Sequence, residues 1–481
     1  MQSRRSSAPS SPLLAPLLAI AIAAAPLHAQ DATTSSERWV GTWKGKLEMP
    51  GALLRLALDV SRSGDVVGGS LTTLDQGNVR IPVALIVRND SLVADMPSIV
   101  ASFAVGLDGD SLRGAWLQNG AIGRLALGHL SRTIVSLDAK RPQEPVGAVP
   151  YGATNVSFPS TNGIVMSGTL TTPPGAGPWP AVVLVSGSGP HDRNGSMFGH
   201  RPFLVLADYL TRRGIAVLRY DDRGVGRSSG SFSTSTTADF TEDAEAAVRF
   251  LAQRPEVDCT RIGMIGHSEG GAIAPLVATR SKDVAFLVLM AAPGLPGDSL
   301  LILQNHAQLR LAGVPGAEAD VLSRLTSRLL HAVASAKDSA DARAHVVQIE
   351  DAYVAEQQPE RRVPLRASLT SRNAQLLTPW MRYFLAYDAR QALAHVRAPV
   401  LALNGTRDGQ VISRENLEAI ATALEAAGNT DFETAELPGL NHLFQTAETG
   451  ATTEYSTIDE TLSPTVLQRI GDWIQKHTQK Q

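Results

Sequence analysis

The stretch Arg261 to Ala278, RIGMIGHSEGGAIAPLVA, constrains the fold of this chain more than any other feature. It places Ser268 between two glycines, after a short apolar run typical of a buried strand and before a run typical of a helix. A sharp turn between a strand and a helix leaves no room for side chains at Gly266 and Gly270. The pattern therefore predicts a strand-turn-helix unit that lifts the Ser268 hydroxyl off the sheet, as a nucleophile requires, although a purely structural serine is the alternative.

On both sides of this unit, apolar strands alternate with helical patterns. PAVVLVSGSGP, IAVLRYDDRG, DVAFLVLMAAPG and APVLALNG are typical of buried strands, and TADFTEDAEAAVRFLAQRP is typical of an amphipathic helix with acidic residues in its first turns. Such alternation predicts an α/β fold with a mostly parallel sheet covered by helices on both faces.

About 100 residues, 294–397, interrupt this alternation. Leu322, Leu325 and Leu329 follow helical spacing there, and the segment has no clear strand. Because strands resume afterwards, we expect a helical cap inserted into the sheet domain rather than a separate helical domain. Six residues could line a pocket under this cap or form its own core: Leu300, Leu301, Leu303, Trp380, Tyr383 and Phe384.

The region before the sheet domain has a different texture. Between residues 35 and 137, short alternating runs are broken by Gly, Asp and Asn, which predicts about seven or eight antiparallel strands in a small barrel or sandwich. A barrel interior could hold a lipid, but small barrels are usually filled by their own side chains, and we favour that interpretation. The proline-rich residues 138–152 are typical of a linker.

The first 29 residues indicate export. A charged start, an apolar centre and small residues near Ala29 are typical of a secretory signal cleaved after Ala29. The apolar run is too short for a membrane span and contains Pro16 and Pro26, so we expect no stable membrane insertion. The predicted location is periplasmic or secreted.

Composition excludes several function classes. The chain has 481 residues, of which 43% are hydrophobic and 19% charged, as in soluble globular proteins. The formal net charge is -3, and loss of Arg4 and Arg5 with the signal would make it -5. Without a basic block, nucleic acid is not an expected partner. The single cysteine, Cys259, excludes an intramolecular disulfide and a Cys-rich metal cluster. The oligomeric state has no sequence signal.

A nucleophilic serine needs a histidine base held by a carboxylate. In a strand-turn-helix hydrolase the acid follows the serine along the chain, on a loop after a later strand. LNGTRDGQV places Asp408 directly after a buried strand. The rival carboxylates Asp431 and Glu433 begin a strand, at the wrong end of the sheet, so Asp408 is the predicted acid.

The predicted base is His442. It follows the next strand in LPGLNHLF, behind a Pro-Gly-Leu-Asn turn. His191, His200 and His267 are rivals because they are expected near the same edge of the sheet, but a single histidine is more often a packing or surface residue.

Two backbone N–H groups are the predicted oxyanion hole. One belongs to Glu269, directly after the serine, and the other to Ser188 in LVSGSGPHDRNG, with Gly189 as the alternative. In the later loop YDDRGVGRSSG we predict that Asp222 and Arg223 form an ion pair that braces the rim of the site.

Taken in order, SGSGPHDRNG, DDRGVGRSSG, GHSEGG, GTRDGQV and GLNH resemble the α/β-hydrolases of the bacterial carboxylesterase and serine aminopeptidase-like group, over residues 156–477. WVGTWKGKL, LDQGN and WLQNG resemble a lipocalin-like module that precedes hydrolase domains in some exported bacterial proteins. The family commonly has glutamine where His191 stands, which puts only the lip of the pocket in doubt.

The resemblance implies a serine hydrolase that cleaves small-molecule carboxylic esters through an acyl-enzyme, without a metal or organic cofactor. An aminopeptidase, acylpeptidase or thioesterase would use the same triad, although a peptidase needs a site for a charged terminus and no acidic pair is evident. A ligand-binding protein with a silent hydrolase domain is the alternative outside enzymes. The predicted organisation is signal peptide 1–29, β-barrel module 35–137, linker 138–152, first part of the hydrolase core 153–293, helical cap 294–397 and second part of the core 398–481.

Overall fold

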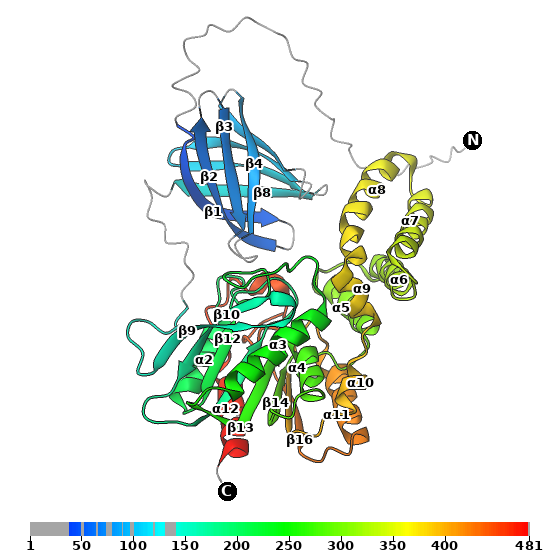
Figure 1. Cartoon of the computed structure of the whole chain (residues 1–481). Helices are drawn as coiled ribbons and strands as arrows, with labels where there is room; N and C mark the ends of the chain where they lie inside the picture. Colours follow the sequence, from blue (N-terminus) through cyan, green and yellow to red (C-terminus); the bar gives the residue numbers. More distant parts are fainter. Residues whose placement is uncertain are drawn as a thin grey trace, which may run out of the picture.

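The structure is a computed structural model that describes residues 38–479, apart from 50–51, 64–65, 74–78, 89, 97–100, 119–120 and 130–140. The predicted signal at 1–29 therefore lies outside the described residues. Figure 1 shows an all-β barrel, a helix-covered sheet and a group of helices that projects from one side of the sheet domain.

The alternating apolar residues near the N-terminus fold into a closed antiparallel barrel, in which β1 pairs with both β2 and β8. The side chains of Trp43, Leu58, Leu92 and Leu112 are all 0% exposed and belong to one core cluster. This packing agrees with the expectation that the barrel is filled by its own side chains. The strands are β1 Gly41–Met49, β2 Ala52–Ser63, β3 Val66–Thr73, β4 Val79–Arg88, β5 Ser91–Met96, β6 Ala101–Asp108, β7 Ser111–Gln118 and β8 Ala121–His129.

The second domain is an eight-stranded sheet in the order β16-β15-β14-β13-β11-β12-β10-β9. The strands from β11 to β16 pair in parallel, and β9 and β10 are antiparallel additions at one edge. The strands are β9 Gly152–Pro159, β10 Val165–Thr172, β11 Trp179–Val185, β12 Ala216–Tyr220, β13 Val257–His267, β14 Phe286–Met290, β15 Val400–Gly405 and β16 Phe432–Leu437. The strand β13 lies in the middle of this sheet, so the residue that follows it is surrounded by the loops of its neighbours.

Helices cover both faces of this sheet, as the strand and helix alternation predicts. The buried residues of α2 and α12 pack with one set of strand side chains, and those of α3, α4, α10 and α11 with the other. The strand β12 is buried at all five positions, because a parallel strand covered on both faces has no solvent side. The helices are α2 Pro202–Arg212, α3 Thr237–Ala252, α4 Glu269–Ala278, α10 Ala389–Leu393, α11 Ser413–Ala426 and α12 Pro464–Thr478.

A helical cap is inserted between β14 and β15. Pro296, where the chain enters the cap, forms an isolated antiparallel bridge with Asp388, where it leaves. Leu325, Leu329 and Leu330 lie in a separate apolar cluster of the cap. Its elements are α5 Gly297–Leu311, α6 Gly316–Ala334, α7 Ser339–Ala355, α8 Pro359–Asn373, the 3-10 turn η3 Ala374–Leu377 and α9 Pro379–Ala386. The short turns η2 Thr161–Gly163 and η4 Thr452–Glu454 complete the described elements.

One strand has no counterpart among the sequence predictions. The edge strand β9 pairs with β10 over all eight of its residues, but only Phe158 of β9 is buried. Because most of its residues face solvent, β9 lacks the apolar run or alternation that predicts a strand.

Candidate active site

Ser268 occupies a strained turn between β13 and α4. Its backbone has φ 54° and ψ -119°, in the left-handed region that non-glycine residues rarely adopt. A Cβ atom at Gly266 would lie 2.1 Å from the carbonyl oxygen of Gly270, and one at Gly270 would lie 2.2 Å from that of Val185. The two glycines are thus required by close backbone approach, as the sequence pattern predicts.

Asp408 and His442 come together at the same end of the sheet. Asp408 follows β15 and His442 follows β16, and His442 Nδ1 lies 2.8 Å from Asp408 Oδ2. The side chain of Asp408 is 0% exposed and that of His442 is 5% exposed. The other oxygen of Asp408 accepts hydrogen bonds from the backbone N–H groups of Gln410 and Val411 at 2.8 and 2.9 Å. This arrangement fixes the carboxylate so that His442 donates from Nδ1, as in a histidine base that is oriented by an acid.

The rival carboxylates are used elsewhere. Asp431 lies 3.3 Å from His477 Nε2, and Glu433 forms an ion pair with Arg469 of α12. Neither carboxylate is near His442, because both lie at the opposite end of β16.

Two of the rival histidines, the half-buried His267 and the buried His200, have other partners. His267 Nε2–H donates to the backbone carbonyl of His442 at 2.9 Å, and the ring centroids lie 4.9 Å apart. Burial lowers the pKa of His267 to about 3, so its imidazole is neutral. His200 contacts the Tyr455 carbonyl and the Thr461 hydroxyl, and burial lowers its pKa to about 4.

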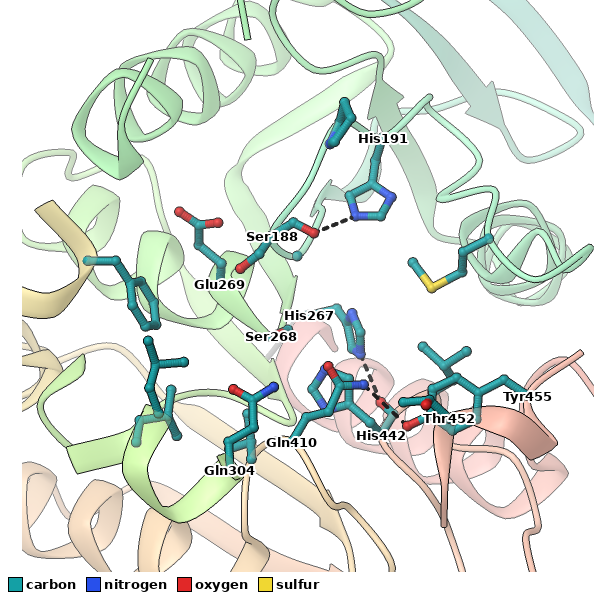
Figure 2. A pocket seen from close by; sticks show the side chains of 18 of the residues that line it. Ser188, His191, His267, Ser268, Glu269, Gln304, Gln410, His442, Thr452 and Tyr455 are labelled. Atoms are coloured by element: carbon teal, nitrogen blue, oxygen red, sulfur yellow. Dashed lines mark hydrogen bonds between the residues drawn. The ribbon is translucent and has the colours of Figure 1, made fainter. Parts of the chain in front are cut away.

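The loop after β11 lies against Ser268. A Cβ atom at Gly187 would lie 3.1 Å from Ser268 Cβ, which brings the backbone of this loop beside the serine. Gly189 has φ 104°, a conformation that suits glycine. The Ser188 carbonyl accepts a hydrogen bond from His191 Nε2 at 3.0 Å. In Figure 2, Ser188 of this loop and Glu269, in the first turn of α4, lie on the same side of Ser268.

The predicted ion pair between Asp222 and Arg223 is wrong. Arg223 binds Asp243 of α3 with Nε and Nη2, at 2.8 and 2.9 Å. Asp222 accepts hydrogen bonds from Ser186 Oγ at 2.7 Å and from the His191 backbone N–H at 2.8 Å. The two residues begin a turn in which the Val225 N–H donates to the Asp222 carbonyl, and their side chains reach different partners, so Asp222 fastens the loop after β11 while Arg223 fastens α3. Burial raises the pKa of Asp222 to about 8.

The side chain of Glu269 joins the turn at Ser268 to the cap. It is 2% exposed, and its Oε1 accepts hydrogen bonds from Thr237 Oγ1 at 2.6 Å and from Trp380 Nε1 at 2.8 Å. Burial raises the pKa of this carboxyl. Trp380 belongs to α9, so the cap is attached within one residue of Ser268.

A cavity of about 480 Å³ opens over Ser268 (Figure 2). Of the six cap residues that the sequence suggested for the pocket lining or the cap core, four line this cavity: Leu300, Leu301, Trp380 and Phe384. Leu303 and Tyr383 are not among its lining residues. Sequence reasoning did not single out six other lining residues, which lie in loops and short turns, in α5 (Gln304) or beside Asp408 (Gln410): Met197, Phe198, Gln304, Gln410, Thr452 and Tyr455.

The described residues contain no group of three or more His, Cys, Asp or Glu side chains arranged to hold a metal ion. Within the same part of the chain, no helix combines the length and the apolar character that a membrane crossing requires.

Known proteins share parts of this chain. The model of the serine aminopeptidase S33 family matches residues 181–448. The esterase EstD of Thermotoga maritima is 36% identical over 136 residues, which are 28% of this chain and 32% of EstD. The esterase FrsA of Enterobacter sp. strain 638 is 29% identical over 185 residues, 38% of this chain and 40% of FrsA. The matches thus span 32% to 40% of the length of these relatives.

Solved structures are also similar. The esterase Pf2001 of Pyrococcus furiosus has 16% sequence identity and a TM-score of 0.41, with 69% of this chain and 98% of that chain covered.

Proposed function

We propose that this chain, which belongs to the serine aminopeptidase S33 family of hydrolases, cleaves carboxylic esters with Ser268 as nucleophile, His442 as base and Asp408 as the orienting acid. The observation that carries the proposal is the buried hydrogen bond of 2.8 Å between His442 and Asp408, at the same sheet edge as a strained serine turn. The esterase names of EstD and FrsA support an ester as substrate.

The first half of the reaction forms an acyl-enzyme. His442 Nε2 takes the proton of the Ser268 hydroxyl while Oγ attacks the acyl carbon. The oxyanion that forms accepts hydrogen bonds from the backbone N–H groups of Glu269 and Ser188. Asp408 holds the imidazole in the correct tautomer and stabilises its positive charge. The intermediate collapses when the bond to the alcohol oxygen breaks and His442 donates the proton to that oxygen.

The second half repeats the chemistry with water. His442 takes a proton from a water molecule, the resulting hydroxide attacks the acyl carbon, and the same N–H groups stabilise the oxyanion. Ser268 leaves with the proton from His442, which releases the carboxylic acid and restores the free enzyme. Each step uses only groups of the chain and water.

The lining of the cavity favours a neutral ester over a peptide with a free amino terminus. Glu269 is the one carboxyl among the described lining residues, and its Oε1 already accepts two hydrogen bonds. A buried carboxyl with a raised pKa is a poor partner for an ammonium group. Leu300, Trp380 and Phe384 instead offer apolar surface to an acyl chain.

A substrate series tests the reaction. Purified mature chain is assayed with p-nitrophenyl esters from acetate to palmitate, with thioesters and aminoacyl anilides in parallel, and Ser268→Ala serves as the control. We expect Ser268-dependent turnover of the esters, with a chain-length optimum that measures the cavity. A folded wild-type protein that cleaves only the anilides would replace the esterase by an aminopeptidase, and one that cleaves only thioesters would make it a thioesterase.

Export is part of the proposal. The charged, apolar and small-residue segments of the first 29 residues support cleavage after Ala29 and a periplasmic or secreted enzyme. Mass spectrometry of the chain recovered from the periplasm or the medium of a Gram-negative host is expected to give an N-terminus at Gln30. Retention of the whole chain inside the cell would contradict this.

A further inference from the structure

The segment between the barrel and the sheet makes unusually specific contacts with the hydrolase domain. Arg141 donates hydrogen bonds to four backbone carbonyl oxygens: from Nε to Gly199 at 3.0 Å, from Nη1 to Ile458 at 2.9 Å, and from Nη2 to Phe198 at 3.2 Å and Ser456 at 3.1 Å. A flexible linker would need none of these contacts.

The four carbonyls belong to two loops that are far apart in the sequence. The first is the turn Met197 to His200, in which Phe198 and Gly199 have φ 50° and 75°. The second runs from η4 to Ile458. Arg141 is bonded to both and therefore holds them at a fixed separation.

Both loops form a wall of the cavity over Ser268. Met197, Phe198, Thr452 and Tyr455 are among its lining residues. The rings of Phe198 and Tyr455 meet edge to face, with centroids 5.2 Å apart. This aromatic pair thus joins, among the lining residues, the same two loops that Arg141 joins through their backbone carbonyls.

Tyr455 also contacts the loop of the catalytic acid. Its side chain is 0% exposed, and its hydroxyl accepts a hydrogen bond from Gln410 Nε2 at 3.2 Å. The backbone N–H of Gln410 in turn donates to Asp408. A continuous set of contacts therefore leads from Arg141 through Tyr455 and Gln410 to Asp408.

The wall lies on the side of the leaving alcohol. His442 must reach the alcohol oxygen to protonate it, so the alcohol lies on the His442 side of Ser268. Figure 2 shows His442, Thr452 and Tyr455 on one side of Ser268, and Glu269 on the other.

Neighbouring contacts fix the backbone that carries Arg141. Gln143 Oε1 accepts hydrogen bonds from the backbone N–H groups of Thr461 and Leu462 at 2.6 and 3.1 Å. Glu144 forms an ion pair with Arg201. The planar guanidinium offers five N–H donors in fixed directions, which a lysine ammonium cannot reproduce across four separate carbonyls.

We propose that Arg141 is a positioning residue that sets the alcohol-side wall of the substrate pocket, an inference that rests on the proposed esterase function. Through Arg141, the segment that connects the barrel to the sheet determines which alcohols the enzyme releases. The acyl group, on the side of the cap, is outside its influence.

Two ester series test this proposal in the full mature chain. One series keeps the acetyl group and enlarges the alcohol from methyl to phenyl and naphthyl, and the other keeps p-nitrophenol and lengthens the acyl chain. We expect Arg141→Ala to raise KM for the naphthyl ester by about tenfold, with a much smaller effect on methyl acetate and on the acyl-chain optimum. Arg141→Lys is expected to have nearly the same raised KM for the naphthyl ester as Arg141→Ala. Added methylguanidinium is expected to lower the KM of Arg141→Ala part of the way back to the wild-type value.

Arg201→Ala is the matched control. This variant loses the ion pair between Arg201 and Glu144 of the connecting segment. Within the described part of the chain, the Arg201 side chain donates hydrogen bonds to Glu144 and to neither of the two pocket loops, so the dependence of KM on the alcohol should equal that of the wild type. An equal loss across both series in Arg141→Ala, together with a lowered unfolding temperature, would overturn the proposal by assigning Arg141 to stability alone.

Hydrogen exchange provides a readout that is independent of turnover. The backbone amides of residues 452–458 are expected to exchange faster in Arg141→Ala than in the wild type or Arg201→Ala. Unchanged exchange there would overturn the positioning role. If the wild type hydrolyses no ester while the exchange difference appears, the esterase proposal fails and the role of Arg141 in holding the two loops remains.

Discussion

Asp408 shows how much a single buried contact can contribute to the site. Its carboxylate accepts two backbone N–H groups on one oxygen and His442 Nδ1–H on the other. A carboxylate satisfied in this way cannot rotate without breaking all three bonds. The imidazole is thereby held in one orientation and one tautomer, which the proposed role of His442 as base requires.

Asp408→Asn should remove this control with little change in volume. An amide can present its NH₂ group to His442 and favour the wrong tautomer, so kcat should fall by about 10³- to 10⁴-fold. Steady-state kinetics on a p-nitrophenyl ester, beside circular dichroism of the same sample, checks the effect. A folded variant that retains a tenth of the wild-type kcat would contradict the role of Asp408.

At the residue scale, the sequence predicts the residues that follow strands and carry a motif. Ser268 lies in a glycine-flanked turn, and Asp408 and His442 each come directly after a strand, where a parallel sheet collects its functional loops. Phe198 and Tyr455 could not be found in this way. They lie in irregular segments, and only contacts across about 250 residues bring them to the pocket.

At the scale of elements, the cap helix α9 and the nucleophile helix α4 are connected through one hydrogen bond. Trp380 Nε1–H donates to Glu269 Oε1, and the Trp380 ring stacks on Phe384 with centroids 5.3 Å apart. Both rings line the cavity, so the position of α9 determines the shape of its cap side, where we propose that the acyl chain binds. The buried Glu269 carboxyl needs its donors, since an unpaired polar group is costly in this environment.

Trp380→Phe should therefore loosen the cap. Loss of the indole N–H leaves the buried carboxyl with one donor fewer, at a cost of about 1 to 3 kcal/mol in the free energy of unfolding. We expect a lower denaturation midpoint and a flattened acyl-chain preference. Tyr383→Phe, in the same helix but outside the cavity lining, is the control, and an unchanged acyl preference in Trp380→Phe would contradict the role of this contact.

The apolar pattern of the sequence predicts some elements better than others, and it does not predict the partners of charged side chains. The buried strands and amphipathic helices were predictable, because burial on both faces or on one face leaves a clear apolar period. The edge strand β9 was missed because it is mostly exposed. The ion pair of Asp222 with Arg223 was wrong because adjacency along the chain says nothing about which side a side chain faces.

At the scale of the whole molecule, the barrel, the connecting segment and the C-terminal loops meet near His200. Its ring contacts Tyr455 and Thr461, which are more than 250 residues away along the chain. Burial lowers the pKa of His200, and the positive charges of Arg141 in the connecting segment and Arg55 in the barrel lower it further. No local pattern predicts this meeting point, since each partner is ordinary within its own segment. Composition and alternation predict the domains, but not the contacts that join them.

His200 makes stability dependent on pH. Burial lowers its pKa to about 4 in the folded chain, from an unfolded value of about 6.5. Between these values the unfolded chain binds one more proton at this site, so this site destabilises the folded state as pH falls from 6.5 to 4. Replacement by His200→Gln should therefore cost less stability at pH 4.5 than at pH 7.5. Urea unfolding of both proteins at the two pH values measures this, and an equal cost at both would contradict a buried, neutral His200.

The most direct measurement of the whole account is mass spectrometry of the chain quenched in acid during turnover of a p-nitrophenyl ester. We predict a single acyl group on the peptide that contains Ser268, and none on the corresponding peptide of Ser268→Ala. An acyl group on another residue, or full turnover by Ser268→Ala, would contradict the account.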